Sequence, residues 1–178
     1  MTPAESPTWR IPPRWVLLLA VLSIVAAEVG GGSMARFKVE LTRWARDGML
    51  AHPTVHGLVG VRDVDERILD EALVKFDAGL RLFHMHAEGM ALVVLATTTV
   101  AATLTRTTVT RRTLIVLLTV GGVGYPLGYL IWSALIPSYG VERGKAIAEW
   151  LVWIPFGGAT IVALLWLAAL TAARMLRR

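Results

Sequence analysis

Hydrophobic residues are concentrated in three long stretches from which charged side chains are almost absent. These stretches are Leu80–Leu104, Thr113–Ile136 and Trp150–Ala172. A helix needs about 20 predominantly apolar residues to cross the hydrocarbon core of a bilayer, and each stretch reaches that length. Charged residues crowd into the segments between them, a segregation that is typical of membrane proteins rather than soluble domains. The pattern predicts three transmembrane helices.

A fourth hydrophobic stretch, Trp15–Val29, is shorter and carries Glu28 near its end. Two interpretations fit it. Arg10 and Arg14, followed by an apolar run that ends in small residues, fit a signal peptide cleaved after Ala27. The alternative is a retained membrane anchor, which we expect. The predicted fold is therefore an all-α, polytopic transmembrane helix bundle with four helices, or three if the N-terminal segment is cleaved.

The segment Ser33–Gly79, between the first two hydrophobic stretches, is also predicted to be partly helical. With Ser33 as the helix cap, apolar residues recur at three- and four-residue spacing. These residues are Met34, Phe37, Leu41 and Trp44. Such spacing suits a helix that lies in the membrane interface.

A second helix is predicted later in the same segment. Pro53 and Gly57 interrupt the first pattern, and Asp63 and Glu66 then have the spacing of a capping box. The helical period continues from there. We expect this helix to run straight into the Leu80–Leu104 span.

The arginines predict the orientation of the chain in the membrane. The linker 105–112 holds three arginines and no acidic residue, and so does the C-terminal tail. Under the positive-inside rule, such clusters mark the cytoplasmic side. The longer segment Ser33–Gly79 carries both signs of charge. We expect both termini in the cytoplasm, Ser33–Gly79 outside, and the protein in a bacterial inner membrane.

The composition agrees with a membrane protein and excludes several classes of site. Of the 178 residues, 55% are hydrophobic, and the mean hydropathy is +0.59. A net charge of +5 would suit nucleic acid. The basic residues flank the apolar runs, however, where they orient a protein in a bilayer, so no nucleic-acid partner is expected. The absence of cysteine excludes disulfides, Fe–S clusters, thiolate zinc and cysteine catalysis.

Glycines and prolines predict how the helices pack. Gly121, Gly124 and Gly128 lie on one side of their helix, where they would let a neighbouring helix approach closely. Pro126 and Pro155 are expected to kink their helices.

The chemistry-bearing residues are concentrated in Arg81–Met90. His84, His86 and Glu88 fall one to two turns inside the outer end of a predicted span. Ionisable groups at that depth cost on the order of a few kcal/mol, so they are usually paired or functional. His84 shares a helix face with Glu88, and His86 shares another with Met90. Because the two histidines point about 200° apart, they cannot both bind one ion on a regular helix.

Haem b is the first cofactor that this segment suggests. It needs an axial histidine and a dry pocket of apolar and aromatic side chains. His84 or His86 would be one ligand, and Glu88 would accept the other ring N–H of His84. The other hydrophobic stretches contain no histidine. A second ligand would come from His52, His56, Met90 or a partner chain.

Copper and zinc are the rival cofactors. His86 with Met90, and Met85 nearby, offers the imidazole and thioether groups that copper accepts. Zinc would need His84 and Glu88 together with His52 or His56. The histidines at 52 and 56 have the i, i+4 spacing of a helical metal site, but Pro53 and Gly57 favour a loop there.

The same residues also allow a role without any cofactor. His84 and Glu88 would then hydrogen-bond each other and tie neighbouring helices together.

The sequence Arg81-Leu-Phe-His84, followed by Gly89 and an apolar run, resembles the histidine-bearing second helix of the catalytic subunits of haem–copper oxidases and nitric oxide reductases. In those families an arginine three residues before the histidine precedes the ligand to a low-spin haem. The resemblance implies that role for His84 alone. The chain lacks the families' further metal-binding histidines, so reduction of oxygen or nitric oxide by this chain alone is not expected.

Three functions follow from this pattern, and none makes the chain an enzyme on its own. The first is an electron-transfer or metal-binding subunit of a larger membrane complex, with haem b or copper near the outer face. The second is a cofactor-free accessory subunit that braces such a complex or a homo-oligomer. The third, a transporter or channel, ranks last because intramembrane charges are few and no inverted repeat is present.

Overall fold

The computed structural model describes residues 9–176, and all its regular elements are helices. The prediction of an all-α bundle is confirmed. In chain order the elements are α1 (Arg14–Arg36), α2 (Lys38–Leu50), α3 (Pro53–His56), α4 (Arg62–Leu104), α5 (Thr108–Gly124), α6 (Leu127–Tyr139), α7 (Val141–Ala148), the π-helix η1 (Glu149–Gly157) and α8 (Gly158–Met175).

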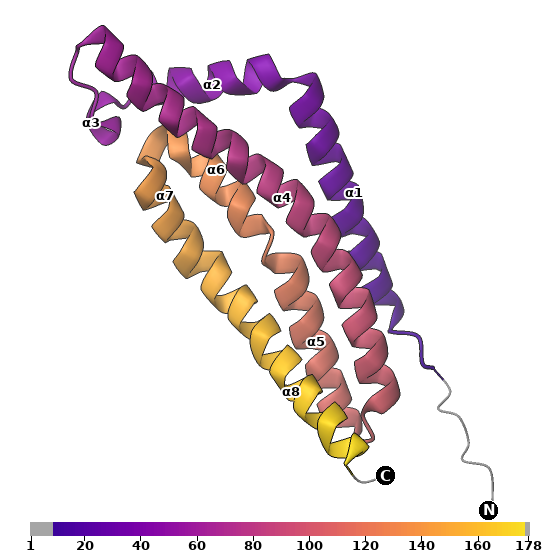
Figure 1. The fold of residues 1–178 in the computed structure, drawn as a ribbon. Helices are drawn as coiled ribbons and strands as arrows, with labels where there is room; N and C mark the ends of the chain where they lie inside the picture. Colours follow the sequence, from indigo (N-terminus) through magenta and orange to yellow (C-terminus); the bar gives the residue numbers. More distant parts are fainter. Residues whose placement is uncertain (1–8, 177–178) are drawn as a thin grey trace, which may run out of the picture.

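Four helical rods are long and apolar enough to cross a membrane: α1, α4, α5 with α6, and α7 with η1 and α8. The chain is thus a multi-pass membrane protein. α4 lies between α1 and the α5–α6 rod, and the α7–α8 rod packs on α5 and α6 (Figure 1). The start of α1, the α4–α5 link and the end of α8 lie toward one end of the bundle, and α2 and α3 lie at the other (Figure 1).

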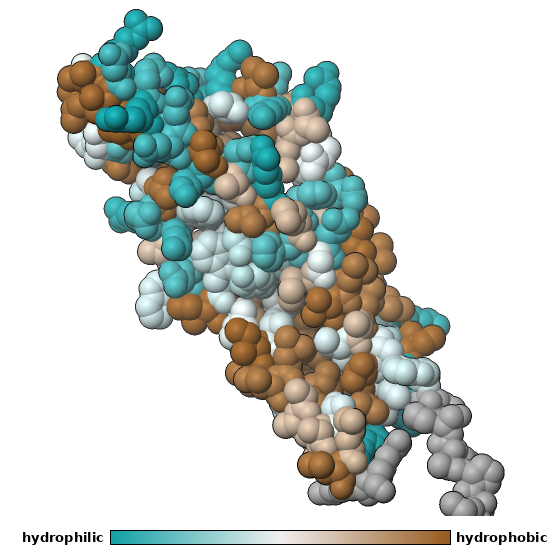
Figure 2. Space-filling view, in the orientation of Figure 1, coloured by the Kyte–Doolittle hydropathy of each residue, from teal (hydrophilic) through white to brown (hydrophobic). Residues whose placement is uncertain are grey.

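α4 is one unbroken helix of 43 residues, as the continuous helical period predicted. At 1.5 Å per residue it is about 65 Å long, roughly twice the thickness of a hydrocarbon core of about 30 Å. Its first turns therefore project beyond the membrane together with α2 and α3. This end of the molecule is the more hydrophilic one (Figure 2).

Two local predictions in this projecting end are wrong. Ser33 does not cap a helix, because α1 continues through it to Arg36 and the chain turns at Phe37. Asp63 and Glu66 do not form a capping box: α4 begins at Arg62 without a side-chain cap.

Neighbouring acidic groups take different partners. Asp65 accepts hydrogen bonds from the backbone N–H groups of Val59 and Gly60 at 2.8 and 2.9 Å, which closes the loop before α4. Glu66 accepts from the guanidinium of Arg46 on α2 at 2.6 Å. This hydrogen bond raises the pKa of Arg46 above its ordinary value. α2 is thereby fastened across α4.

Both prolines disturb their rods as predicted. Proline lacks the backbone N–H that a helix needs and its ring clashes with the preceding turn. α5 ends at Gly124 and α6 begins at Leu127, so the rod is interrupted around Pro126. Pro155 lies inside the π-helix η1. The two irregular segments face each other across the bundle, since η1 packs against α5 and α6.

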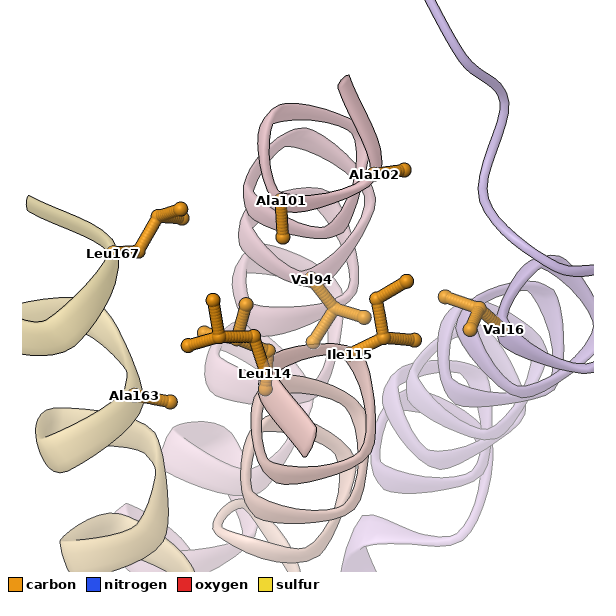
Figure 3. Packing of buried hydrophobic residues seen from close by; sticks show 9 residues of the cluster. Val16, Val94, Ala101, Ala102, Leu114, Ile115, Ala163 and Leu167 are labelled. Carbon is orange, nitrogen blue, oxygen red and sulfur yellow. The ribbon is translucent and has the colours of Figure 1, made fainter. Parts of the chain in front are cut away.

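One hydrophobic cluster fills the bundle at the end opposite α2. Its side chains come from four rods and point toward one another (Figure 3). They are Val16 of α1, Val94, Ala101 and Ala102 of α4, Leu114, Ile115 and Leu118 of α5, and Ala163 and Leu167 of α8.

Close approach between helices depends on glycine. A Cβ at Gly121, Gly124 or Gly128 would lie 2.3–2.4 Å from an atom of Thr160, Phe156 or Trp153. The three glycines thus face η1 and α8, and the prediction that they admit a close neighbour is confirmed. On the other side of the α5–α6 rod, Gly79 of α4 meets Ser133 of α6, whose hydroxyl donates to the Phe76 carbonyl at 2.9 Å.

Gly79 and Gly89 of α4 provide a matched test of this packing. A Cβ at Gly79 would lie 2.1 Å from Ser133 Oγ, whereas a Cβ at Gly89 meets nothing within 4 Å. Gly79→Ala should lower the free energy of unfolding by about 1–3 kcal/mol, the usual cost of overpacking. Gly89→Ala should cause no loss. Thermal unfolding of the detergent-purified variants measures both, and equal stability would contradict the close α4–α6 contact.

Candidate functional site

His84 lies on the face of α4 that contacts α1. Its Nδ1 is 2.8 Å from the backbone carbonyl oxygen of Ala27. A carbonyl only accepts, so Nδ1 carries the proton and donates it. The half-buried imidazole also packs against Gly31, because a Cβ there would come within 2.9 Å of the ring. α1 therefore fixes both the position of the ring and its tautomer.

Small residues of α1 make this contact close. Val16, Ala20, Ser23 and Ala27 are the buried residues of α1, and they recur at three- and four-residue spacing. The Ser23 hydroxyl donates to the carbonyl of Ala87 at 3.0 Å. Sequence reasoning missed this interface, although the repeated small residues are its signal. Cleavage after Ala27 would cut α1 within this contact, and retention of the segment stays a prediction.

His86 lies on a different face of α4, as the helical spacing predicted. Its Nδ1 donates to the carbonyl of Leu82, one turn earlier, at 2.8 Å. Its ring centre is 4.6 Å from that of Tyr129 and 5.9 Å from that of Tyr125. His86 is therefore attached to its own helix and packed against tyrosines of the α5–α6 rod.

An aromatic cluster continues from His86 across the bundle. The hydroxyl groups of Tyr125 and Tyr129 are 3.0 Å apart. The Tyr129 ring lies 4.9 Å from that of Trp153, which in turn lies 6.2 Å from that of Trp132. The sequence did not predict that Tyr125 and Tyr129 meet His86.

The other predicted ligands on α4 are not gathered around one histidine. Glu88 is half-buried and does not hydrogen-bond to His84. The predicted pair is therefore wrong, because the Ala27 carbonyl takes the N–H that Glu88 was expected to accept. The terminal methyl of Met90 lies toward Gly122 of α5, on the His86 side. Met85 is 62% exposed and points away from the bundle.

His52 and His56 lie far from α4's histidines along the fold and do not act together. His52 precedes the one-turn helix α3, and its Nδ1 donates to the Gly48 carbonyl at 2.8 Å. His56 ends α3, and its Nε2 donates to the Pro137 carbonyl at 3.0 Å. The expected break at Gly57 is present, with a positive φ of 68°. Each histidine holds a loop to a different helix.

Within residues 9–176, no three histidine or acidic side chains converge as a metal-binding group. Single imidazoles, however, are held by hydrogen bonds that suit a metal ligand. A neutral imidazole whose Nδ1–H is bound to a carbonyl presents the lone pair of Nε2, which is the form that binds metals. In both His84 and His86 the Nδ1–H is bound to a carbonyl in this way, so each neutral ring would present its lone pair on Nε2. His84 fits a single-ligand site better, since two helices position it.

No protein-family model matches the chain, and no curated protein or solved structure matches it.

Proposed function

We propose that the chain is a small subunit of a bacterial inner-membrane complex and that His84 is the ligand for a haem b or a copper ion near its outer face. The observation that carries this proposal is the 2.8 Å hydrogen bond from His84 Nδ1 to the Ala27 carbonyl. It sets the tautomer in which Nε2 is free to bind iron or copper. It also holds the ring between two helices, so little motion is left to freeze when a ligand binds.

His84 is preferred over His86 because the two imidazole rings pack against different neighbours. His86 is hydrogen-bonded only within α4, and its ring lies 4.6 Å from the Tyr129 ring. His84 packs against glycine. A bound haem or copper would supply one-electron transfer, and the protein's contribution is to orient the imidazole and keep it in an apolar surrounding, with Phe83 of the same helix buried beside it.

A second ligand must come from elsewhere, since the other spans carry no histidine. Another subunit or a second copy of this chain is the source we propose for haem. Copper on His84 would need its further ligands from the same source, because His86 and Met90 lie on a different face of α4 from His84.

The second candidate is a cofactor-free brace in a membrane complex. The same His84–Ala27 hydrogen bond favours it, because it joins α4 to α1. In this case His84 contributes stability only, and the projecting end with α2 and α3 contacts the partner.

Adding haem or copper to purified variants distinguishes the two. His84→Ala should abolish binding, whereas His86→Ala should retain it within a few-fold. Glu88→Gln should bind like the wild type, because Ala27 and not Glu88 orients the imidazole. Visible spectra and metal analysis report the binding, and His52→Ala is the control.

Unchanged affinity in His84→Ala would end the cofactor proposal at this position. If the free energy of unfolding of that variant is also lower by about 1–3 kcal/mol, the result supports the cofactor-free brace.

The proposed orientation puts both termini in the cytoplasm. It is supported by the acid-free arginine clusters of the linker 105–112 and of the C-terminal tail. The α4–α5 link and the end of α8 lie at the end of the bundle opposite α2 and α3 (Figure 1), and Arg177 and Arg178 of the tail lie outside the described residues. The chain has no cysteine, so a single one can be introduced at exposed Thr54 or Thr108. An impermeant thiol reagent should label position 54 in spheroplasts, and label position 108 only after the membrane is opened. The reverse labelling would contradict the orientation.

A further inference from the structure

A cavity of about 610 Å³ opens between the α5–α6 rod and the π-helix. This volume falls within the range of small-molecule pockets, about 300–1,000 Å³. The residues that give it its chemistry are Tyr125, Tyr129, Trp132, Lys145, Glu149 and Trp153. It lies on the far side of the Tyr129 ring from α4, so it is separate from His84.

The cavity exists because both of its walls depart from regular helix. The interruption at Pro126 forms one wall, and η1 forms the other. Glycines let the aromatic rings pack closely against the opposite helix. A Cβ at Gly157 would lie 3.2 Å from the Tyr125 ring, and a Cβ at Gly128 would lie 2.3 Å from Trp153 Nε1. π-Helical turns are rare and are found frequently at functional sites.

Polar groups stand on two sides of this aromatic space. One hydroxyl of the Tyr125–Tyr129 pair donates to the other at 3.0 Å, which leaves the acceptor's own proton free to donate. On the other wall, Lys145 and Glu149 form no ion pair within residues 9–176. The cavity thus combines flat rings for stacking with residues that carry hydrogen-bond donors on two of its walls.

The entrance faces the lipid. Ile154 and Ile161 line the cavity and are 48% and 60% exposed, respectively, on a rod that is long and apolar enough to cross a membrane. A ligand that dissolves in the membrane reaches the site directly. An acyl chain would leave the hydroxyl and ammonium donors unused.

We infer that this cavity binds the ring of a membrane quinone. A quinone has a flat ring that stacks on tyrosine and tryptophan, two carbonyl oxygens on opposite sides, and a tail soluble in lipid. One carbonyl accepts from the tyrosine pair and the other from the Lys145 ammonium, while the tail passes Ile154. Only binding is inferred, and it requires no haem or copper on His84.

The test uses the full chain in lipid nanodiscs and a benzoquinone with a single isoprene unit as the probe. Quinone binding should quench tryptophan fluorescence and saturate. Tyr129→Phe keeps the ring but breaks the hydroxyl pair, and Lys145→Met removes the charged donor. Each should weaken binding by about tenfold, the effect of one good hydrogen bond.

Three controls make the outcome decisive. Trp44→Phe, in a separate apolar groove beneath α2, and His52→Ala, outside the cavity lining, should both bind quinone like the wild type. An isoprenoid alcohol of the same length should not compete. The inference is overturned if the wild type shows no saturation, if the alcohol competes equally, or if both cavity variants bind normally while retaining the wild-type melting temperature.

Discussion

A helix in lipid gains little from burying apolar side chains against another helix, because the acyl chains are equally apolar. Packing must come from close contact, and close contact needs residues without bulky side chains. α4 meets α1 through Ser23, Ala27 and the glycines that follow, and it meets α6 through Gly79. The hydrogen bonds of His84 to Ala27 and of Ser133 to Phe76 depend on these two approaches.

The two histidines of α4 show that dependence. Because α1 comes close at Ala27 and Gly31, its backbone reaches the imidazole of His84 and accepts its proton. On another face, the irregular α5–α6 rod brings Tyr125 and Tyr129 to His86. Two residues that are two positions apart in the sequence thus belong to different surroundings. One is held by the backbone of α1, and the other joins an aromatic cluster beside a cavity.

The large-scale fold could be predicted because each rod has its own local signal. Apolar length identified the spans, the unbroken helical period carried α4 through to Leu104, and the prolines marked the irregular segments. The end of α1 was predicted wrongly for a physical reason. Gly30, Gly31, Gly32 and Ser33 resemble a break, but here the first two are the surface on which Phe83 and His84 of α4 pack. Tertiary contact overrides their low helix propensity.

The contacts that the site residues make could not be predicted from the local sequence pattern. Helical spacing predicted that His84 and His86 face apart, but which backbone or ring each meets depends on how neighbouring helices rotate. The carboxylate assigned to His84 was a reasonable choice at i+4, and a carbonyl of another helix took its place. The predicted capping box is absent for a similar reason. The backbone N–H groups of Val59 and Gly60, before α4, donate to the carboxylate of Asp65 instead.

The central claim is that α1 fixes the imidazole of His84 with its proton on Nδ1 and its lone pair on Nε2. Nitrogen-15 NMR in lipid bilayers measures this directly, using a variant in which His84 is the single histidine (His52→Ala, His56→Ala and His86→Phe). The account predicts a protonated Nδ1 and an unprotonated Nε2, with the Nδ1 signal altered when Gly31→Val displaces the ring. A proton on Nε2 with a bare Nδ1 would contradict it, because two acceptors cannot form the hydrogen bond between His84 and Ala27.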